Sequence, residues 1–311
     1  MIMKKLLVLT LVLHGFSGWA QQVPQYTHHI LNMFGINPAF AGSKKCLDLK
    51  MGYREQWRGF EGAPKTAYAN MHGKIAENKF NFHGIGGRVE TDDAGPLSYT
   101  ALNFAYAYHM KVNHKSMFSA GLAAGFLQWR IDGGGITLPE TGFFDDPVLG
   151  STQAQFIFPT IDFGLWWYRD DRFVSLAFRN LVERKVENVG MDTRINRHYI
   201  LTGGRVTDIG DEFYFRTSVN IKYVPNSKLA IDLVGMIDYN DKIALGLGVR
   251  NGNGLMGLVR FDVFDYVTLA YSYDLTVSKI RFDGRSTHEV ILGIQACAKN
   301  AKGGIPCSAY D

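Results

Sequence analysis

The sequence predicts an all-β protein, a transmembrane β-barrel of the outer membrane with about 14 antiparallel strands. An export signal occupies the N-terminus, and the segments after it alternate large apolar residues with small or polar ones. No uncharged apolar stretch after residue 20 reaches the ~18 residues that mark a spanning helix. The composition agrees, because 13% aromatic residues and 34 Gly beside 9 Pro favour many strands over long helices.

Residues 1–20 have the layout of a secretory signal peptide. Two lysines form a positively charged start, an apolar run follows from Leu6 to Phe16, and residues 18–20 supply a small-residue exit. A retained membrane anchor is the alternative, but a run of about eleven residues is well short of the ~20 that a spanning helix needs. We therefore expect cleavage after Ala20, so that the exported chain begins at Gln21.

The alternating segments predict membrane-crossing strands. Large apolar side chains alternate with small or polar ones between residues 101 and 108, between 213 and 222, and between 244 and 250. A period of two places the two sets on opposite faces of a strand, which suits lipid outside and a filled or wet interior. A soluble β-sandwich also alternates, but its strands usually run about five or six residues, whereas these run about nine to fourteen with aromatic residues at their ends.

The number of strands and the connections between them support each other. An even count brings both ends of the barrel to the periplasmic side. The short turns then fall on that side, and the long connections, 131–157, 181–197 and 276–288, fall on the outer side. The expected strands are residues 46–57, 64–75, 80–91, 97–111, 116–130, 158–169, 172–180, 197–206, 212–224, 228–238, 242–250, 254–263, 266–275 and 287–297.

No linker-like Pro/Ser stretch or block of charge divides the chain, so we expect one barrel domain with short extensions. Residues 1–20 are the signal peptide and residues 21–45 an N-terminal leader, which would lie as a periplasmic or plug segment. Residues 46–297 form the barrel, and residues 298–311 a C-terminal tail.

Three cysteines are too few for a disulfide-built scaffold. Cys46 begins the first expected strand and Cys297 ends the last, and these two strands pair when a barrel closes. A bridge from Cys46 to either Cys297 or Cys307 would join the seam, which export permits. The alternative is three thiols without a bridge.

The search for chemistry predicts no catalytic residue, metal site or cofactor. His28 and His29 are adjacent on the leader without the spacing or third ligand of a metal site. Gly84–Gly87 is followed by no helix that could hold a phosphate, and its glycines are expected to face the lumen. No motif brings a Ser, a His and an orienting group together, so we expect no enzyme. A formal net charge of +4 without a basic cluster argues against nucleic acid as a partner.

Two strings of residues carry a specific resemblance. Residues 37–43 read Asn-Pro-Ala-Phe-Ala-Gly-Ser, and residues 56–66 read Gln-Trp-Arg-Gly-Phe-Glu-Gly-Ala-Pro-Lys-Thr. With the blocks at 93–97, 106–109 and 118–125, they make the chain resemble the PorP/SprF family of type IX secretion and gliding-motility membrane proteins of Bacteroidetes-type bacteria. The similarity covers most of the exported chain. The tail at 298–311 departs from it, because barrels of this family tend to finish on their last strand.

The resemblance implies an outer-membrane accessory component of the type IX secretion system. Such a protein would aid the export or surface attachment of specific cargo, such as a gliding adhesin with a C-terminal sorting domain. It would work beside the type IX translocon and a periplasmic peptidoglycan-linked partner. The competing function is a general diffusion porin for small solutes, which requires a continuous aqueous lumen.

The leader holds the candidate site. Asn37 and Pro38 form a turn that would end any short helix before the first strand. A leader that contacts a periplasmic partner would do so through an apolar and aromatic surface; the alternative is a leader that plugs its own lumen. The candidate contact residues are Tyr26, Phe34, Asn37, Pro38 and Phe40.

Overall fold

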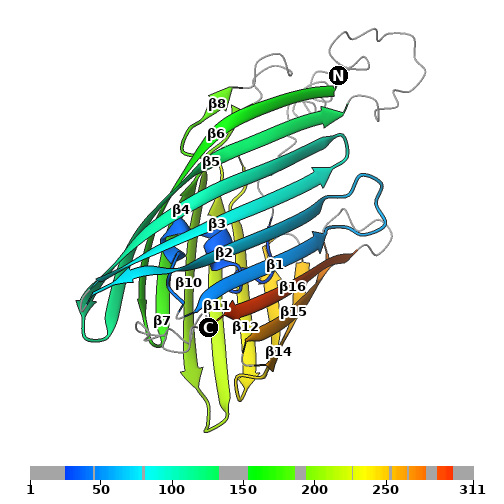
Figure 1. The fold of residues 1–311 in the computed structure, drawn as a ribbon. Helices are drawn as coiled ribbons and strands as arrows, with labels where there is room; N and C mark the ends of the chain where they lie inside the picture. The colour runs from blue at the N-terminus through cyan, green and yellow to red at the C-terminus, as the bar shows by residue number, and fades with distance from the viewer. Residues whose placement is uncertain are drawn as a thin grey trace, which may run out of the picture.

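The computed structural model shows a closed barrel of 14 antiparallel strands and a separate two-stranded hairpin (Figure 1). It describes residues 25–44, 46–78, 81–132, 153–185, 194–225, 227–251, 254–264, 266–277 and 286–296. The predicted signal peptide and C-terminal tail lie outside these ranges.

The strands follow one another around the wall, and the first closes the barrel by pairing with the last. In this antiparallel closure Leu47 lies opposite Ala296, and Glu55 lies opposite His288. The barrel strands are β1 (Leu47–Glu55), β2 (Lys65–Glu77), β3 (Asn81–Ala94), β4 (Leu97–Asn113), β5 (Ser116–Asp132), β6 (Gln153–Arg169), β7 (Arg172–Arg179), β10 (His198–Asp208), β11 (Phe213–Tyr223), β12 (Ala230–Tyr239), β13 (Ile243–Arg250), β14 (Gly254–Phe264), β15 (Val267–Thr276) and β16 (Ser286–Ala296).

The predicted fold is confirmed, because each expected segment overlaps one barrel strand. The largest difference in a strand lies in β6, which begins at Gln153 rather than at residue 158. Its extension pairs with the end of β5, where Ala154 lies opposite Ile131. The connection expected at 181–197 also contains a hairpin of β8 (Arg184–Lys185) and β9 (Arg194–Ile195). The extension of β6 and the β8–β9 hairpin both depend on pairing with another strand rather than on residue type. The alternation of residues along the sequence therefore did not predict them.

The two faces of the wall differ as the period of two predicts. On β4 and β13, Phe104 is 66% exposed and Leu247 is 78% exposed, whereas Ala107 and Ala244 are fully buried. The exposed row is large and apolar, as a lipid-facing surface requires. On these two strands the inward row is mostly small, polar or charged, whereas β6 also places Trp166 and Tyr168 inward.

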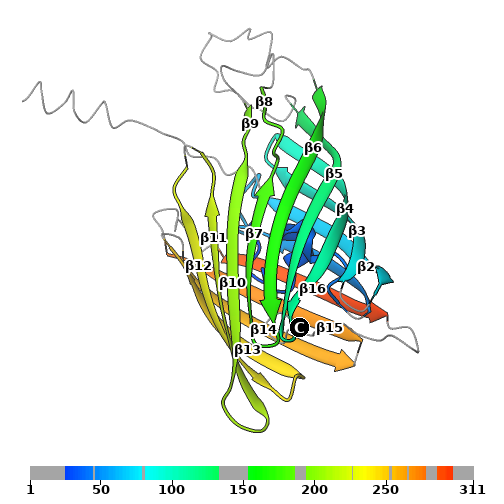
Figure 2. The same cartoon turned by 90° about the vertical axis from the view of Figure 1, so that its left-hand side faces the viewer.

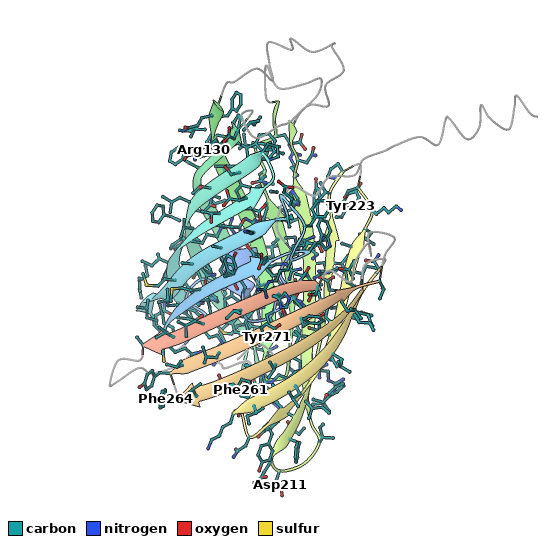
Figure 3. The ribbon with its side chains drawn as sticks, turned by 90° about the vertical axis from the view of Figure 1, so that its right-hand side faces the viewer. Arg130, Asp211, Tyr223, Phe261, Phe264 and Tyr271 are labelled. Atoms are coloured by element: carbon teal, nitrogen blue, oxygen red, sulfur yellow. The ribbon has the colours of Figure 1, made fainter. Side chains whose placement is uncertain are left out.

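The connections distinguish the two ends of the barrel. At one end the strands are joined by short turns, such as 114–115, 170–171 and 240–242, whereas the other end carries the connections at 133–152 and 180–197. Outer-membrane barrels have short periplasmic turns and longer extracellular loops, so the first end is periplasmic. Figure 3 shows Asp211 at this end and Arg130 toward the opposite one.

Within the described residues, helical structure is confined to two short segments before the barrel. These are α2 (Met33–Ile36) and the 3₁₀ helix η1 (Pro38–Phe40). In the described part of the chain, no helix is both long and apolar enough to cross a membrane.

Candidate functional site: the leader within the barrel

The leader, described from Gln25 to Lys44, lies in the lumen of the barrel (Figures 1 and 2). Most of its side chains are buried, and His29, Asn32 and Met33 are each 1% exposed. Both its short helices are buried throughout. The segment that the sequence placed under or inside the barrel is therefore surrounded by the wall.

The leader crosses the lumen from the extracellular end to the periplasmic end. Gln25 borders a cavity together with Ser227 and Lys228, which lie in the extracellular turn between β11 and β12. At the other end, the Gly42 amide donates a hydrogen bond to the His72 ring at 3.2 Å. The chain then enters β1, so β1 returns along the wall in the direction from which the leader came.

A charged cluster on β1, β15 and β16 holds the start of the leader. Arg54 donates to Glu289 and to Asp274, each at 2.9 Å, and to the Thr27 hydroxyl at 2.7 Å. The Thr27 hydroxyl in turn donates to Asp274 at 2.8 Å, and its amide donates to Glu289 at 2.7 Å. Arg54 is 3% exposed and Glu289 is fully buried. Such charges are tolerated in an interior because they are paired and hydrogen-bonded to one another.

A second cluster contacts the leader from β3. The Tyr26 hydroxyl donates to Glu90. Arg88 is ion-paired with Asp162 and donates to the carbonyl oxygen of Gly35 at 2.6 Å. The two clusters thus place wall charges against the leader between Tyr26 and Gly35.

The two leader histidines contact different strands. The ring of His28 donates to the carbonyl oxygen of Tyr271 at 3.0 Å, and the ring of His29 lies 3.0 Å from the Ser218 hydroxyl. In the residues that the structure describes, no group of three or more His, Cys, Asp or Glu side chains could hold a metal ion. These histidines serve as hydrogen-bonding groups of the leader.

Asn37 fixes the turn between α2 and η1. Its side-chain oxygen accepts the Ala39 amide at 2.8 Å, which caps η1, and Pro38 begins that helix without needing a donor. Its side-chain nitrogen donates to the Ser175 hydroxyl at 2.7 Å and to the Leu165 carbonyl oxygen at 3.0 Å. Asn37 therefore closes α2 through its backbone amide, which donates to Met33, and its side chain starts η1 and attaches the turn to β6 and β7.

The periplasmic half of the leader is held by apolar and aromatic contacts. The Phe40 ring lies 4.7 Å from the Trp166 ring and 5.4 Å from the His72 ring, and the Phe34 ring lies 4.8 Å from His72. Met33 joins the same buried cluster. Full burial of side chains of this size contributes about 1.5–3 kcal/mol each, so this half is a strong apolar anchor.

Inward glycines make room for the leader backbone. A Cβ atom at Gly84 would overlap the backbone of Ala41, and one at Gly121 would overlap that of Ala39. A Cβ at Gly164 would overlap the side chain of Asn37. The expectation that Gly84 is a small lumen-facing position is correct, and the structure supplies its reason, which is close approach of another backbone.

Two small cavities lie between the leader and the wall. One cavity of about 40 Å³ lies beside Gln25 and Tyr26, and another of about 30 Å³ lies beside Arg88 and Trp129. A water molecule needs about 10–15 Å³ by the same measure. Each cavity thus has room for a few waters and not for a solute.

Comparison with known proteins agrees with this architecture. The family model described as type IX secretion system membrane protein PorP/SprF matches residues 19–294. The chain belongs to the PorP/SprF family. No curated protein sequence matches it.

Solved structures show the same kind of barrel. The toluene transporter TbuX of Ralstonia pickettii is 11% identical, with a TM-score of 0.52 over 84% of this chain and 92% of that one. The toluene transporter TodX of Pseudomonas putida is 10% identical, with a TM-score of 0.45 over 89% and 94%. At such identity the first likeness shows the fold alone. Together with PorP/SprF membership, the fold places the protein in the outer membrane.

The five predicted contact residues all lie inside the lumen, distributed along the leader. Each is buried against the wall of the barrel, so contact with a partner would require the leader to move. They are Tyr26, Phe34, Asn37, Pro38 and Phe40.

Cys46 lies just before β1 and is disulfide-bonded. Its candidate partners Cys297 and Cys307 lie outside the described residues. The pairing remains a prediction.

Sequence reasoning missed the charged residues that hold the leader. Arg54, Arg88 and Glu289 occupy inward positions of strands whose outward positions are apolar. The same period of two that predicted the barrel places these residues on the inward face. Charged side chains at inward positions need partners, so the pattern could have identified them as candidate contacts of a segment in the lumen.

Proposed function

We propose that this PorP/SprF-family barrel is a non-enzymatic accessory of the type IX secretion system. It aids the export or surface attachment of specific cargo, such as a gliding adhesin that carries a C-terminal sorting domain. Its partners are the type IX translocon, a periplasmic peptidoglycan-linked protein and the cargo itself. Family membership supplies the secretion system, and the specific role with cargo is the proposal.

The observation that carries this proposal is the filled lumen. A diffusion porin needs a continuous aqueous channel, whereas the leader here is bound along the lumen by paired charges and apolar anchors. A barrel of this kind serves better as a membrane-embedded scaffold than as a conduit for small solutes. Its useful surfaces are the two ends of the barrel, the wall and the leader.

Mass spectrometry of surface and secreted proteins from cells with and without the gene tests the role. Loss of one or a few large proteins with type IX sorting domains is the expected result. An unchanged set of proteins would contradict a cargo-specific role.

A leader deletion separates the contribution of the leader from that of the barrel. Removing residues 24–42 should leave a heat-modifiable barrel in the outer membrane and abolish cargo export. Full export by this variant would show that the leader fills space without serving secretion. The full-length gene expressed from the same plasmid is the matched control.

A further inference from the structure

We propose that the N-terminus of the exported chain opens to the cell exterior, while the chain enters β1 from the periplasmic side. The leader is then a segment threaded through its own barrel, with one end available to proteins outside the cell. This inference rests on the path of the leader and is independent of the cargo role.

The first described residues of the leader lie at the extracellular end. Gln25 and Tyr26 border a cavity that is also lined by Val224, Ser227 and Lys228, all in the turn that follows β11. That turn lies at the opposite end of the barrel from the short periplasmic turns. The start of the leader is therefore at the extracellular mouth.

The contacts that follow fix the direction. Thr27 is bound by Arg54 and Asp274, which lie near the extracellular ends of β1 and β15. The carbonyl oxygen of Ala39 accepts a hydrogen bond from the Ser119 hydroxyl at 2.7 Å, and that of Ala41 accepts one from the His109 ring at 2.8 Å. Ser119 and His109 lie near the periplasmic ends of β5 and β4. The start and the end of the leader therefore lie toward opposite ends of the lumen. The path between them folds back once, because Ile36 shares an apolar cluster and a cavity with Tyr26 whereas Met33 packs with Phe40.

The residues before Gln25 are too few to return to the periplasm. After cleavage behind Ala20, four residues precede it, and four extended residues reach at most about 14 Å. The nine residues of β1 alone span about 30 Å at 3.3 Å per residue. With cleavage after Ala20, as predicted from the sequence, the N-terminus would be held near the extracellular mouth for as long as the leader is bound.

This path changes which proteins could meet the leader. A partner that binds the free end must approach from outside, where secreted and surface-attached proteins are found. The leader residues that the sequence offered to a periplasmic partner are covered by the wall.

An epitope tag inserted between Gln22 and Val23 tests the proposal on whole cells. Antibody should bind intact cells to the same extent as cells with the tag after Glu61, in the extracellular turn between β1 and β2. A tag after Gly210, in the periplasmic turn before β11, should be detected only after the outer membrane is permeabilised. Heat-modifiable migration confirms in each case that the barrel has folded.

Detection of the N-terminal tag only after permeabilisation, with the Glu61 tag visible on intact cells, would overturn the proposal. If the tag prevents folding, Val23→Cys replaces it, and a membrane-impermeant maleimide is read by mass spectrometry of the N-terminal peptide. Labelling of intact cells supports the extracellular end, and labelling only after permeabilisation refutes it. Neither result depends on cargo export, so failure here leaves the proposed function standing.

Discussion

The glycines that face the leader offer a precise perturbation of its docking. Gly84 and Gly87 lie on the same strand, β3, and point to opposite faces. A Cβ at Gly84 would overlap backbone atoms of Ala41 and Gly42, which cannot rotate away, whereas one at Gly87 would meet the Phe104 ring at an ordinary 3.5 Å. Gly84→Ala should therefore disturb the leader, and Gly87→Ala serves as the matched control.

Overpacking of a close contact by one methyl group costs about 1–3 kcal/mol. Because 1.4 kcal/mol corresponds to a factor of ten, the undocked fraction of the leader should rise about 5- to 140-fold in Gly84→Ala. The apolar anchors, Phe34 and Phe40 among them, oppose full release of the periplasmic half. We therefore expect a leader that opens more often and a barrel that stays closed.

Hydrogen–deuterium exchange of the purified protein in detergent measures this opening. Peptides from residues 25–43 should exchange faster in Gly84→Ala by the same factor, while peptides from β10 to β14 keep the rates of the unsubstituted protein. Gly87→Ala should leave the leader unchanged. Equal leader exchange in the two variants would refute the close packing of leader and wall.

Three further predictions concern the contacts of the leader and the seam. Arg54→Ala removes the ion-pair partner of buried Glu289 and leaves Asp274 with Arg250 alone, so it should cost about 3–5 kcal/mol in urea unfolding followed by heat modifiability. Arg58→Ala removes a surface ion pair 3.7 Å from Glu55 and should cost under about 1 kcal/mol. Equal costs would contradict the buried cluster. Asn37→Ala removes side-chain hydrogen bonds that contribute about 1–3 kcal/mol, so hydrogen–deuterium exchange of the leader should be about 5- to 140-fold faster. An unchanged exchange rate would count against the capping role of Asn37. A non-reduced digest should contain one peptide that joins Cys46 to Cys297 or Cys307, and finding only unlinked peptides would contradict a bridged seam.

The sequence was sufficient to predict the barrel because its information is local and repeated. Alternation along β4 and β13 could be read without knowing any partner, and the connections supplied the sides of the membrane. The hairpin β8–β9 escaped prediction because its two-residue strands carry no period that a pattern could detect.

The candidate site could be predicted only in part. The leader was recognised as a unit, and Asn37–Pro38 as its turn, because both depend on local backbone preferences. The sequence left open whether the leader lies in the lumen or below it, and its direction depends on contacts such as Thr27 with Glu289, which are 262 residues apart in sequence. No local pattern reports a contact over that separation. That the leader begins at the extracellular end of the lumen is therefore seen only in the three-dimensional structure.

Single-channel recording in planar bilayers tests most directly whether the leader closes the barrel. The intact protein should show no large, steady open channels, and the variant lacking residues 24–42 should show them, because the lumen then loses the segment that fills it. Large, steady channels from the intact protein would contradict the filled lumen and favour the diffusion porin.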